Sequence, residues 1–214
     1  MIDSDEIEKR QAIIDACLRM SAMGINQGTS GNISVRHVDG LLITPTRMPY
    51  EMMRPGDIIR MTFDGEATGK HQPSSEWRFH CDIMRSRPDV AAIVHAHPVH
   101  ATTIAIMELD IPPLHYMIGA AGGHDIRCAP YAIWGSQELS DNALAALEGR
   151  KACLLGHHGI IAVGNSLSRA LWLANEVENL AKQFHGCLAI GGPKLLSSQD
   201  IDAVLAKMGG YGHA

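Results

Sequence analysis

The segment that most constrains the fold is Ala92-Ile-Val-His-Ala-His-Pro98, in which three apolar residues lead into two histidines. Short apolar runs are typical of buried β-strands, and side chains two positions apart in a strand point to the same face. His95 and His97 are therefore expected to project together at the end of a buried strand. Two neutral imidazoles on one face can form the first half of a metal site.

Two other segments contain residues that could complete such a site. Gly156-His-His-Gly159 places a further histidine between two short apolar runs, and Pro73-Ser-Ser-Glu-Trp77 places Glu76 beside two serines. Each feature also has an ordinary explanation, because an isolated HxH pair occurs by chance and Glu76 suits the positive end of a helix dipole. The combination of four candidate ligands favours a metal site.

Composition narrows the class of protein. The chain has 214 residues and no linker, repeat or charge block, so we predict a single domain over residues 1–214. The net charge of -5, without a basic cluster, argues against a nucleic-acid partner. Five cysteines without a CxxC pair indicate reduced thiols and a cytoplasmic protein. The acidic first residues are unlike a signal peptide, and no apolar run approaches the length of a membrane span.

Hydrophobic periodicity and turn residues predict alternating helices and strands. Because several neighbouring strands are joined by hairpin turns, we expect one sheet with substantial antiparallel pairing, covered by helices. In the helix that begins near residue 73, Ser74 or Ser75 is the expected N-cap and Glu76 lies in the first turn. The glycine-rich tail at about 209–214 is expected to be mobile. Helices are predicted at 4–23, 73–84, 99–107, 138–147, 166–190 and 199–207, and strands at 33–36, 41–44, 57–63, 92–96, 114–118, 152–155 and 160–163.

Eight motifs distributed over essentially the whole chain form a specific pattern. They are NQGTSGN at 26–32, LLITPT at 41–46, PSSEWRFH at 73–80, VHAHPVH at 94–100, HYMI at 115–118, CAPY at 128–131, LLGHHG at 154–159 and ALWLANEVE at 170–178. On these motifs the chain resembles the class II aldolase/adducin family, and within it the aldolases that act on L-fuculose 1-phosphate.

The resemblance implies a three-layer αβα sandwich with a central mixed, largely antiparallel sheet. It implies Zn²⁺, with Co²⁺ or Mn²⁺ as alternatives, held by His95, His97 and His158, and by Glu76 when substrate is absent. The implied assembly is a homotetramer with active sites at the subunit interfaces. Tyr116 corresponds to a catalytic tyrosine that reaches across such an interface, and Tyr211 corresponds to a catalytic tyrosine of the mobile tail.

The resemblance also implies how a phosphorylated substrate is held. The phosphate-binding positions correspond to Thr29, Asn32, Thr46, Ser74 and Ser75. Arg47 stands where these aldolases usually have glycine, so its guanidinium either adds a contact to the phosphate or points outward. We include Arg47 among the candidate phosphate ligands.

The implied activity is reversible cleavage of a ketose 1-phosphate, of the L-fuculose 1-phosphate type, to dihydroxyacetone phosphate and an aldehyde. The metal would act as Lewis acid and Glu76 as base. One alternative is an aldolase for 5-methylthioribulose or 5-deoxyribulose 1-phosphate in nucleoside salvage. A second is a sugar-phosphate 4-epimerase, which relies on an aspartate that the segment HYMIGAAGG lacks. A third is a metal-free interaction module, as in adducin heads, where the metal histidines are lost.

Overall fold

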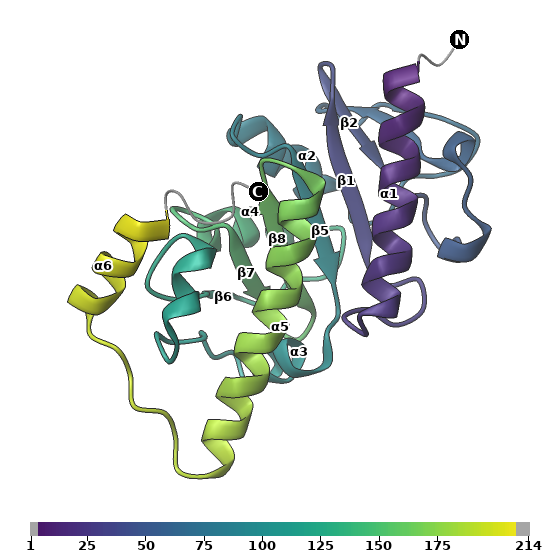
Figure 1. Cartoon of the computed structure of the whole chain (residues 1–214). Coiled ribbons are helices and arrows are strands. Elements are labelled where there is room, and N and C mark those ends of the chain that lie inside the picture. Colours follow the sequence, from purple (N-terminus) through teal and green to yellow (C-terminus); the bar gives the residue numbers. More distant parts are fainter. Residues whose placement is uncertain (1–3, 209–214) are drawn as a thin grey trace.

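The computed structural model of the protein describes residues 4–208, which contain one sheet of eight strands in the order β4-β3-β2-β1-β5-β8-β7-β6 (Figure 1). Neighbouring strands are antiparallel except for β6 and β7, so the predicted mixed, largely antiparallel sheet is confirmed. The strands are β1 (Asn32–His37), β2 (Gly40–Ile43), β3 (Ile59–Thr62), β4 (Ala67–Thr68), β5 (Ala92–Ala96), β6 (Cys128–Ala129), β7 (Ala152–Leu155) and β8 (Gly159–Gly164).

Helices cover both faces of the sheet and complete the expected three-layer sandwich. Helices α1, α3 and α5 lie on one face, whereas α2 and α4 pack against each other on the opposite face (Figure 1). Helix α6 packs against the short helix η3. The helices are α1 (Ser4–Ala22), α2 (Trp77–Ser86), α3 (Val99–Ile106), α4 (Gln137–Ala146), α5 (Leu167–Ala189) and α6 (Ser198–Met208), with 3₁₀ helices η1 (Tyr50–Met52), η2 (Pro55–Asp57) and η3 (Tyr116–Ala121).

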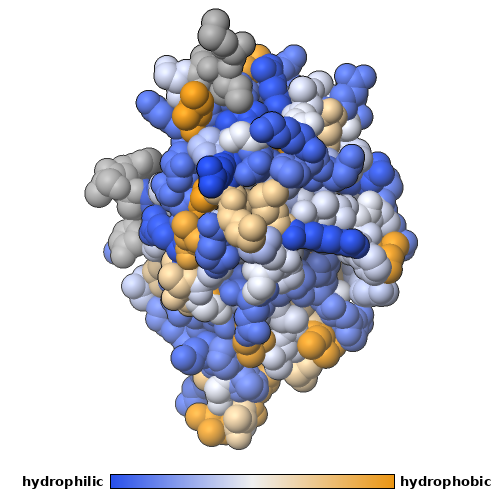
Figure 2. All heavy atoms as spheres, turned by 90° about the vertical axis from the view of Figure 1, so that its right-hand side faces the viewer, coloured by the Kyte–Doolittle hydropathy of each residue, from blue (hydrophilic) through white to orange (hydrophobic). Residues whose placement is uncertain are grey.

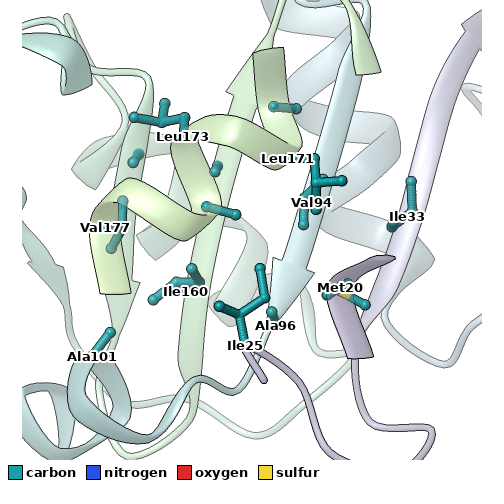
Figure 3. Close-up of a cluster of buried hydrophobic side chains, with 14 of the residues drawn as sticks. Met20, Ile25, Ile33, Val94, Ala96, Ala101, Ile160, Leu171, Leu173 and Val177 are labelled. Atoms are coloured by element: carbon teal, nitrogen blue, oxygen red, sulfur yellow. The ribbon is translucent and has the colours of Figure 1, made fainter. Parts of the chain in front are cut away.

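Strand β5 shows how the sequence is divided between the two outer layers. Val94 and Ala96 belong to the larger apolar cluster, which lies between the sheet and helices α1 and α5 (Figure 3). Ile93 points the other way, into the second apolar cluster beneath α2 and α4. His95 shares the face of Ile93, because strand residues two apart point in the same direction. The strand predicted from the HxH segment is thus confirmed.

Two predicted strands differ from the structure. Residues 114–118 are not a strand, because Tyr116–Ala121 forms η3, and the ring of His115 accepts a hydrogen bond from the N–H of Met117. Pro112 and Pro113 precede it, and proline has no N–H to donate to a strand ladder. The strand expected from residue 57 begins later, at Ile59, because Pro55–Asp57 forms η2.

The surface is mixed in polarity. Figure 2 shows the right-hand side of Figure 1, where hydrophobic residues occur in small separate groups among hydrophilic ones. Within residues 4–208, no helix combines the length and apolar character needed to cross a membrane. The predicted mobile tail at about 209–214, with Tyr211, lies outside the described residues.

Candidate active site

The four predicted metal ligands meet at one end of the sheet. The ligand atoms of Glu76, His95, His97 and His158 all lie within 4.8 Å of one another. Nε2 of His95 is 3.1 Å from Oε2 of Glu76, and Nε2 of His158 is 3.0 Å from Oε1. Nε2 of His97 is 2.9 Å from Nε2 of His95. The structure therefore brings together four side chains that could hold a metal ion.

Strand pairing explains why these side chains meet. Strand β5 runs antiparallel to β8, with His95 opposite Ile161. The turn that leads into β8 therefore lies where β5 ends, and it carries His158. His157 has a φ of 55°, a left-handed conformation that separates the directions of the two adjacent histidines. His158 joins the cluster, whereas the side chain of His157 is 48% exposed and lies 3.5 Å from Glu108.

Glu76 enters the cluster from the start of helix α2, which packs on the face of the sheet that carries His95. Helix α2 begins at Trp77 rather than near residue 73, so Glu76 occupies the N-cap position and not the first turn. Neither Ser74 nor Ser75 is the N-cap. Ser74 Oγ instead accepts a hydrogen bond of 3.3 Å from the N–H of Glu76. The Glu76 carboxylate makes no capping bond and is turned toward the histidines.

The charge states of the cluster suit a divalent cation. Burial, and to a lesser extent the neighbouring His95 and His158, lower the pKa of His97 to about 3, so His97 is neutral at pH 7. Burial alone raises the pKa of Glu76, but His95 and His158 outweigh this effect and hold it well below its usual range. His95 Nδ1 lies 2.9 Å from the carbonyl of Ile160, which only accepts, so Nδ1 carries the proton. Nε2, the other ring nitrogen of His95, then faces the cluster.

The geometry also fits an ion better than a hydrogen-bonded network. The three imidazole rings lie edge-on to one another, with centroids 4.8, 4.9 and 4.9 Å apart. Oε1 of Glu76 is buried and lacks a well-aligned hydrogen bond among the described residues, although His158 Nε2 is close. Three imidazole nitrogens and one carboxylate are a typical donor set for Zn²⁺ and similar metals. A cation at their centre would satisfy these unpaired acceptors together.

A polar cavity of about 250 Å³ adjoins the cluster. Its walls come from the loop before β1, the loop after β2 and the segment before α2. The hydrogen bond from Ser74 N to Thr44 O joins the last two of these. Glu76 lies in its wall, so the cavity and the cluster are contiguous. All six candidate phosphate ligands line it: Thr29, Asn32, Thr46, Arg47, Ser74 and Ser75.

A second cavity, of about 380 Å³, opens on the histidine side of Glu76. Its walls include Tyr131 and Trp134, which are 54% and 63% exposed. Trp134 also lines the polar cavity, so the two spaces are neighbours. Neither aromatic residue was predicted from the sequence, where the only signal was the position of Tyr131 within the motif CAPY.

The remaining predicted catalytic residues lie elsewhere. Tyr116 is the first residue of η3 and is 49% exposed, and it is absent from the described walls of both cavities. Tyr211 falls outside residues 4–208. Sequence analysis also missed Ser34 and His80, which lie behind Glu76. Their signal was spacing, since Ser34 follows Asn32 by two positions on a strand and His80 follows Glu76 by four at a helix.

Known proteins are similar to this chain in sequence and in fold. The profile of the family "Class II Aldolase and Adducin N-terminal domain" matches residues 11–185. The chain is 51% identical over 201 residues to an L-fuculose phosphate aldolase of Escherichia coli K12, covering 94% of each chain. It is 50% identical over 206 residues to a 5-methylthioribulose-1-phosphate/5-deoxyribulose-1-phosphate aldolase of Rhodospirillum rubrum, covering 96% of this chain and 93% of that protein. A solved L-fuculose 1-phosphate aldolase matches with a TM-score of 0.92 at 35% identity, covering 98% of each chain.

The chain therefore belongs to the class II aldolase and adducin family. The named aldolases match this chain over nearly their full length. Its site contains a Glu/His group that could bind a metal. The protein is accordingly a metal-dependent aldehyde-lyase of the class II aldolase type.

Proposed function

We propose that this aldolase uses Zn²⁺ to cleave a ketose 1-phosphate reversibly, with L-fuculose 1-phosphate as the first candidate, to dihydroxyacetone phosphate and an aldehyde. The observation that carries the proposal is that a polar cavity of about 250 Å³ adjoins a cluster of three histidines and one glutamate. A ketose 1-phosphate places its phosphate and its carbonyl a few bonds apart. Such a substrate can occupy the cavity and reach the cluster together.

The chain's own polar groups hold the phosphate in this proposal. Hydroxyl groups of Thr29, Thr46, Ser74 and Ser75 donate hydrogen bonds to its oxygens, and Asn32 donates from its amide. Arg47 adds the positive charge of its guanidinium from the rim, where it is exposed. A phosphate is bound in this way without a buried lysine.

Glu76 is the proposed base. Zn²⁺, or Co²⁺ or Mn²⁺ in its place, supplies Lewis-acid stabilisation of the negative charge that develops on the substrate oxygens. Glu76 is ionised, because its pKa lies below the usual range, and it can therefore accept a proton. In the direction of synthesis it takes that proton from C3 of dihydroxyacetone phosphate.

Tyr116 is the proposed proton donor to the aldehyde oxygen, acting on the site of a neighbouring subunit in a homotetramer. Its exposure and its position away from its own chain's cavities support this arrangement. Tyr211 of the tail is proposed to assist at the same site. Mixed oligomers of Tyr116→Phe and Glu76→Gln, each inactive alone, should regain activity if sites are shared. An active monomer, or no recovery in verified mixed oligomers, contradicts this part of the proposal.

A second candidate substrate has its own support. The relative from Rhodospirillum rubrum is named for 5-methylthioribulose 1-phosphate and 5-deoxyribulose 1-phosphate, and it is 50% identical to this chain. Tyr131 and Trp134 give the second cavity an aromatic wall, which suits an aldehyde with an apolar end. These ketose 1-phosphates share the part of the molecule that becomes dihydroxyacetone phosphate.

A substrate panel tests both candidates. With the Zn²⁺-loaded protein, release of dihydroxyacetone phosphate is measured from L-fuculose 1-phosphate, 5-methylthioribulose 1-phosphate and 5-deoxyribulose 1-phosphate. Release of dihydroxyacetone is measured from unphosphorylated L-fuculose. We expect cleavage of at least one phosphorylated ketose and far weaker cleavage of the unphosphorylated sugar. No cleavage of any phosphorylated ketose with Zn²⁺, Co²⁺ or Mn²⁺ would overturn the proposal, and a product epimerised at C4 would indicate an epimerase.

A further inference from the structure

A row of buried polar side chains ends at Oε2 of Glu76, the oxygen that also lies 3.1 Å from Nε2 of His95. Ser34 Oγ is 2.7 Å from Nδ1 of His80, and Nε2 of His80 is 2.6 Å from Oδ1 of Asn32. Nδ2 of Asn32 donates to Oε2 of Glu76 at 2.9 Å. Ser34 and His80 are fully buried and Asn32 is 3% exposed. The reaction proposed above assigns no role to Ser34 or His80.

Only one pattern of donors and acceptors satisfies this row. Burial lowers the pKa of His80 to about 3, so its ring is neutral, with one N–H donor and one acceptor nitrogen. If the amide of Asn32 were reversed, its oxygen would face the Glu76 carboxylate and two acceptors would meet. The amide therefore presents its N–H₂ to Glu76 and its oxygen to His80. His80 must then carry its proton on Nε2 and accept at Nδ1 from the hydroxyl of Ser34.

The fold holds these groups in place. Asn32 and Ser34 lie two positions apart on β1, and Asn32 pairs with His95 across the strands. His80 lies on α2, one helical turn after Glu76, and its ring stacks on Phe79 at 4.6 Å. Strand β1 and helix α2 thus carry every member of the row, and the pairing of β1 with β5 holds Asn32 in place.

We propose that His80 is a positioning residue: it locks the Asn32 amide in the one orientation that serves both Glu76 and the phosphate cavity. Asn32 lines that cavity, and an amide has two N–H donors. One is bonded to Glu76, and the second is directed to a phosphate oxygen. Ser34 fixes the tautomer of His80 and so supports the same orientation. The role of the second N–H rests on the proposed function, whereas the tautomer and the lock do not.

The first test compares two substitutions of His80. His80→Gln keeps an amide donor for Asn32 and an acceptor for Ser34, whereas His80→Leu removes both. Changing groups that orient metal ligands typically costs about 10- to 100-fold in activity or metal affinity. We expect His80→Leu to lose kcat by about that factor and to raise the KM for the phosphorylated ketose, and His80→Gln to stay within about threefold of wild type. Equal losses in both variants, or none in His80→Leu, would overturn the proposal.

A matched control separates positioning from folding. His37 is also buried, at 4% exposure, but its neighbour is Glu6 rather than the active site. His37→Leu should lower stability without changing kcat or KM of the folded protein. If His37→Leu reduced kcat as much as His80→Leu, the effect at His80 would be one of folding, and the proposal would fail.

The second test needs no turnover. ¹⁵N NMR of the imidazole nitrogens in chelator-treated wild type reports the tautomer of His80, whose signals are identified by their loss in His80→Gln. We expect a proton on Nε2 and an unprotonated, hydrogen-bonded Nδ1. A proton on Nδ1 would overturn the inference.

Titration with inorganic phosphate should then show weaker binding to His80→Leu than to His80→Gln. If wild type shows the expected tautomer but neither binds phosphate nor cleaves a ketose 1-phosphate, the proposed function fails and the lock stands.

Discussion

The two faces of the central sheet bury different kinds of side chain on the same strands. Beneath α1 and α5, strand β5 buries Val94 and Ala96 in an aliphatic cluster (Figure 3). Beneath α2, the other face of β5 buries Ile93 and His95, and β1 adds Asn32. Apolar groups pack without specific partners, whereas every buried polar group needs one. The aliphatic face therefore provides stability, and the polar end of the other face provides chemistry.

The largest effect should come from breaking the polar face at its metal ligands. We predict that His97→Ala loses bound metal and at least about 10³-fold in activity, since a Lewis-acid metal contributes several kcal/mol and each 1.36 kcal/mol is tenfold. The free energy of unfolding of the chelator-treated protein should change by less than about 1 kcal/mol, as expected away from the core. Elemental analysis, dihydroxyacetone phosphate release and urea unfolding measure the three quantities. Full metal content with wild-type activity would contradict the prediction.

The aliphatic face should respond in the opposite way. Leu180 of α5 is fully buried, so Leu180→Ala should lower the free energy of unfolding by about 2–5 kcal/mol. Metal content and KM of the folded protein should be unchanged, because Leu180 is absent from the described walls of both cavities and from the metal-ligand cluster. Leu188→Ala, on the same helix but 37% exposed, is the control and should cost under about 1 kcal/mol. A loss of metal in Leu180→Ala at full folding would show that the two faces are not separable.

The same contrast explains what could be predicted from the sequence. Periodicity located all six α-helices of residues 4–208 and the paired orientation of His95 and His97, because both depend on local spacing. It failed at 114–118, where the apolar residues suggested a strand although two prolines precede them. The choice of His158 over His157 came from the family resemblance, and the left-handed backbone at His157 now explains it.

The row that ends at Glu76 could not be predicted in this way. Asn32 and Glu76 are 44 positions apart, and Asn32 and His80 are 48 positions apart. Contacts over such separations depend on how β1 and α2 pack, and neither element alone contains that information. Buried polar contacts of this kind are satisfied one by one, so no average hydrophobic pattern reveals them.

The pH dependence of the free energy of unfolding should also distinguish the two faces, with an effect of intermediate size. The pKa of His80 is about 3 in the folded protein and 6.5 ordinarily. Below pH 6.5 the unfolded chain takes up a proton at His80 and the folded chain does not, so stability is lost as pH falls from 6.5 toward 3. Chelator-treated wild type should lose stability faster than His80→Gln, by a difference approaching about 1.4 kcal/mol per pH unit. Leu180→Ala should run parallel to wild type, and parallel curves for wild type and His80→Gln would contradict the prediction.

The smallest effect is expected at the rim, where Arg47 belongs to neither face. Arg47 is exposed and has a φ of 57°, a left-handed conformation that glycine adopts more readily than arginine. Exposed charge pairs contribute about 0.2–1 kcal/mol, so losing the guanidinium should raise the KM for a ketose 1-phosphate by about two- to fivefold.

Arg47→Gly and Arg47→Ala should raise KM equally, because both remove the charge. They should differ in stability, since the left-handed conformation at position 47 is unfavourable for alanine but not for glycine. Addition of salt should reduce the KM difference from wild type by screening an exposed charge. An unchanged KM in both variants would mean that the guanidinium points away from the phosphate.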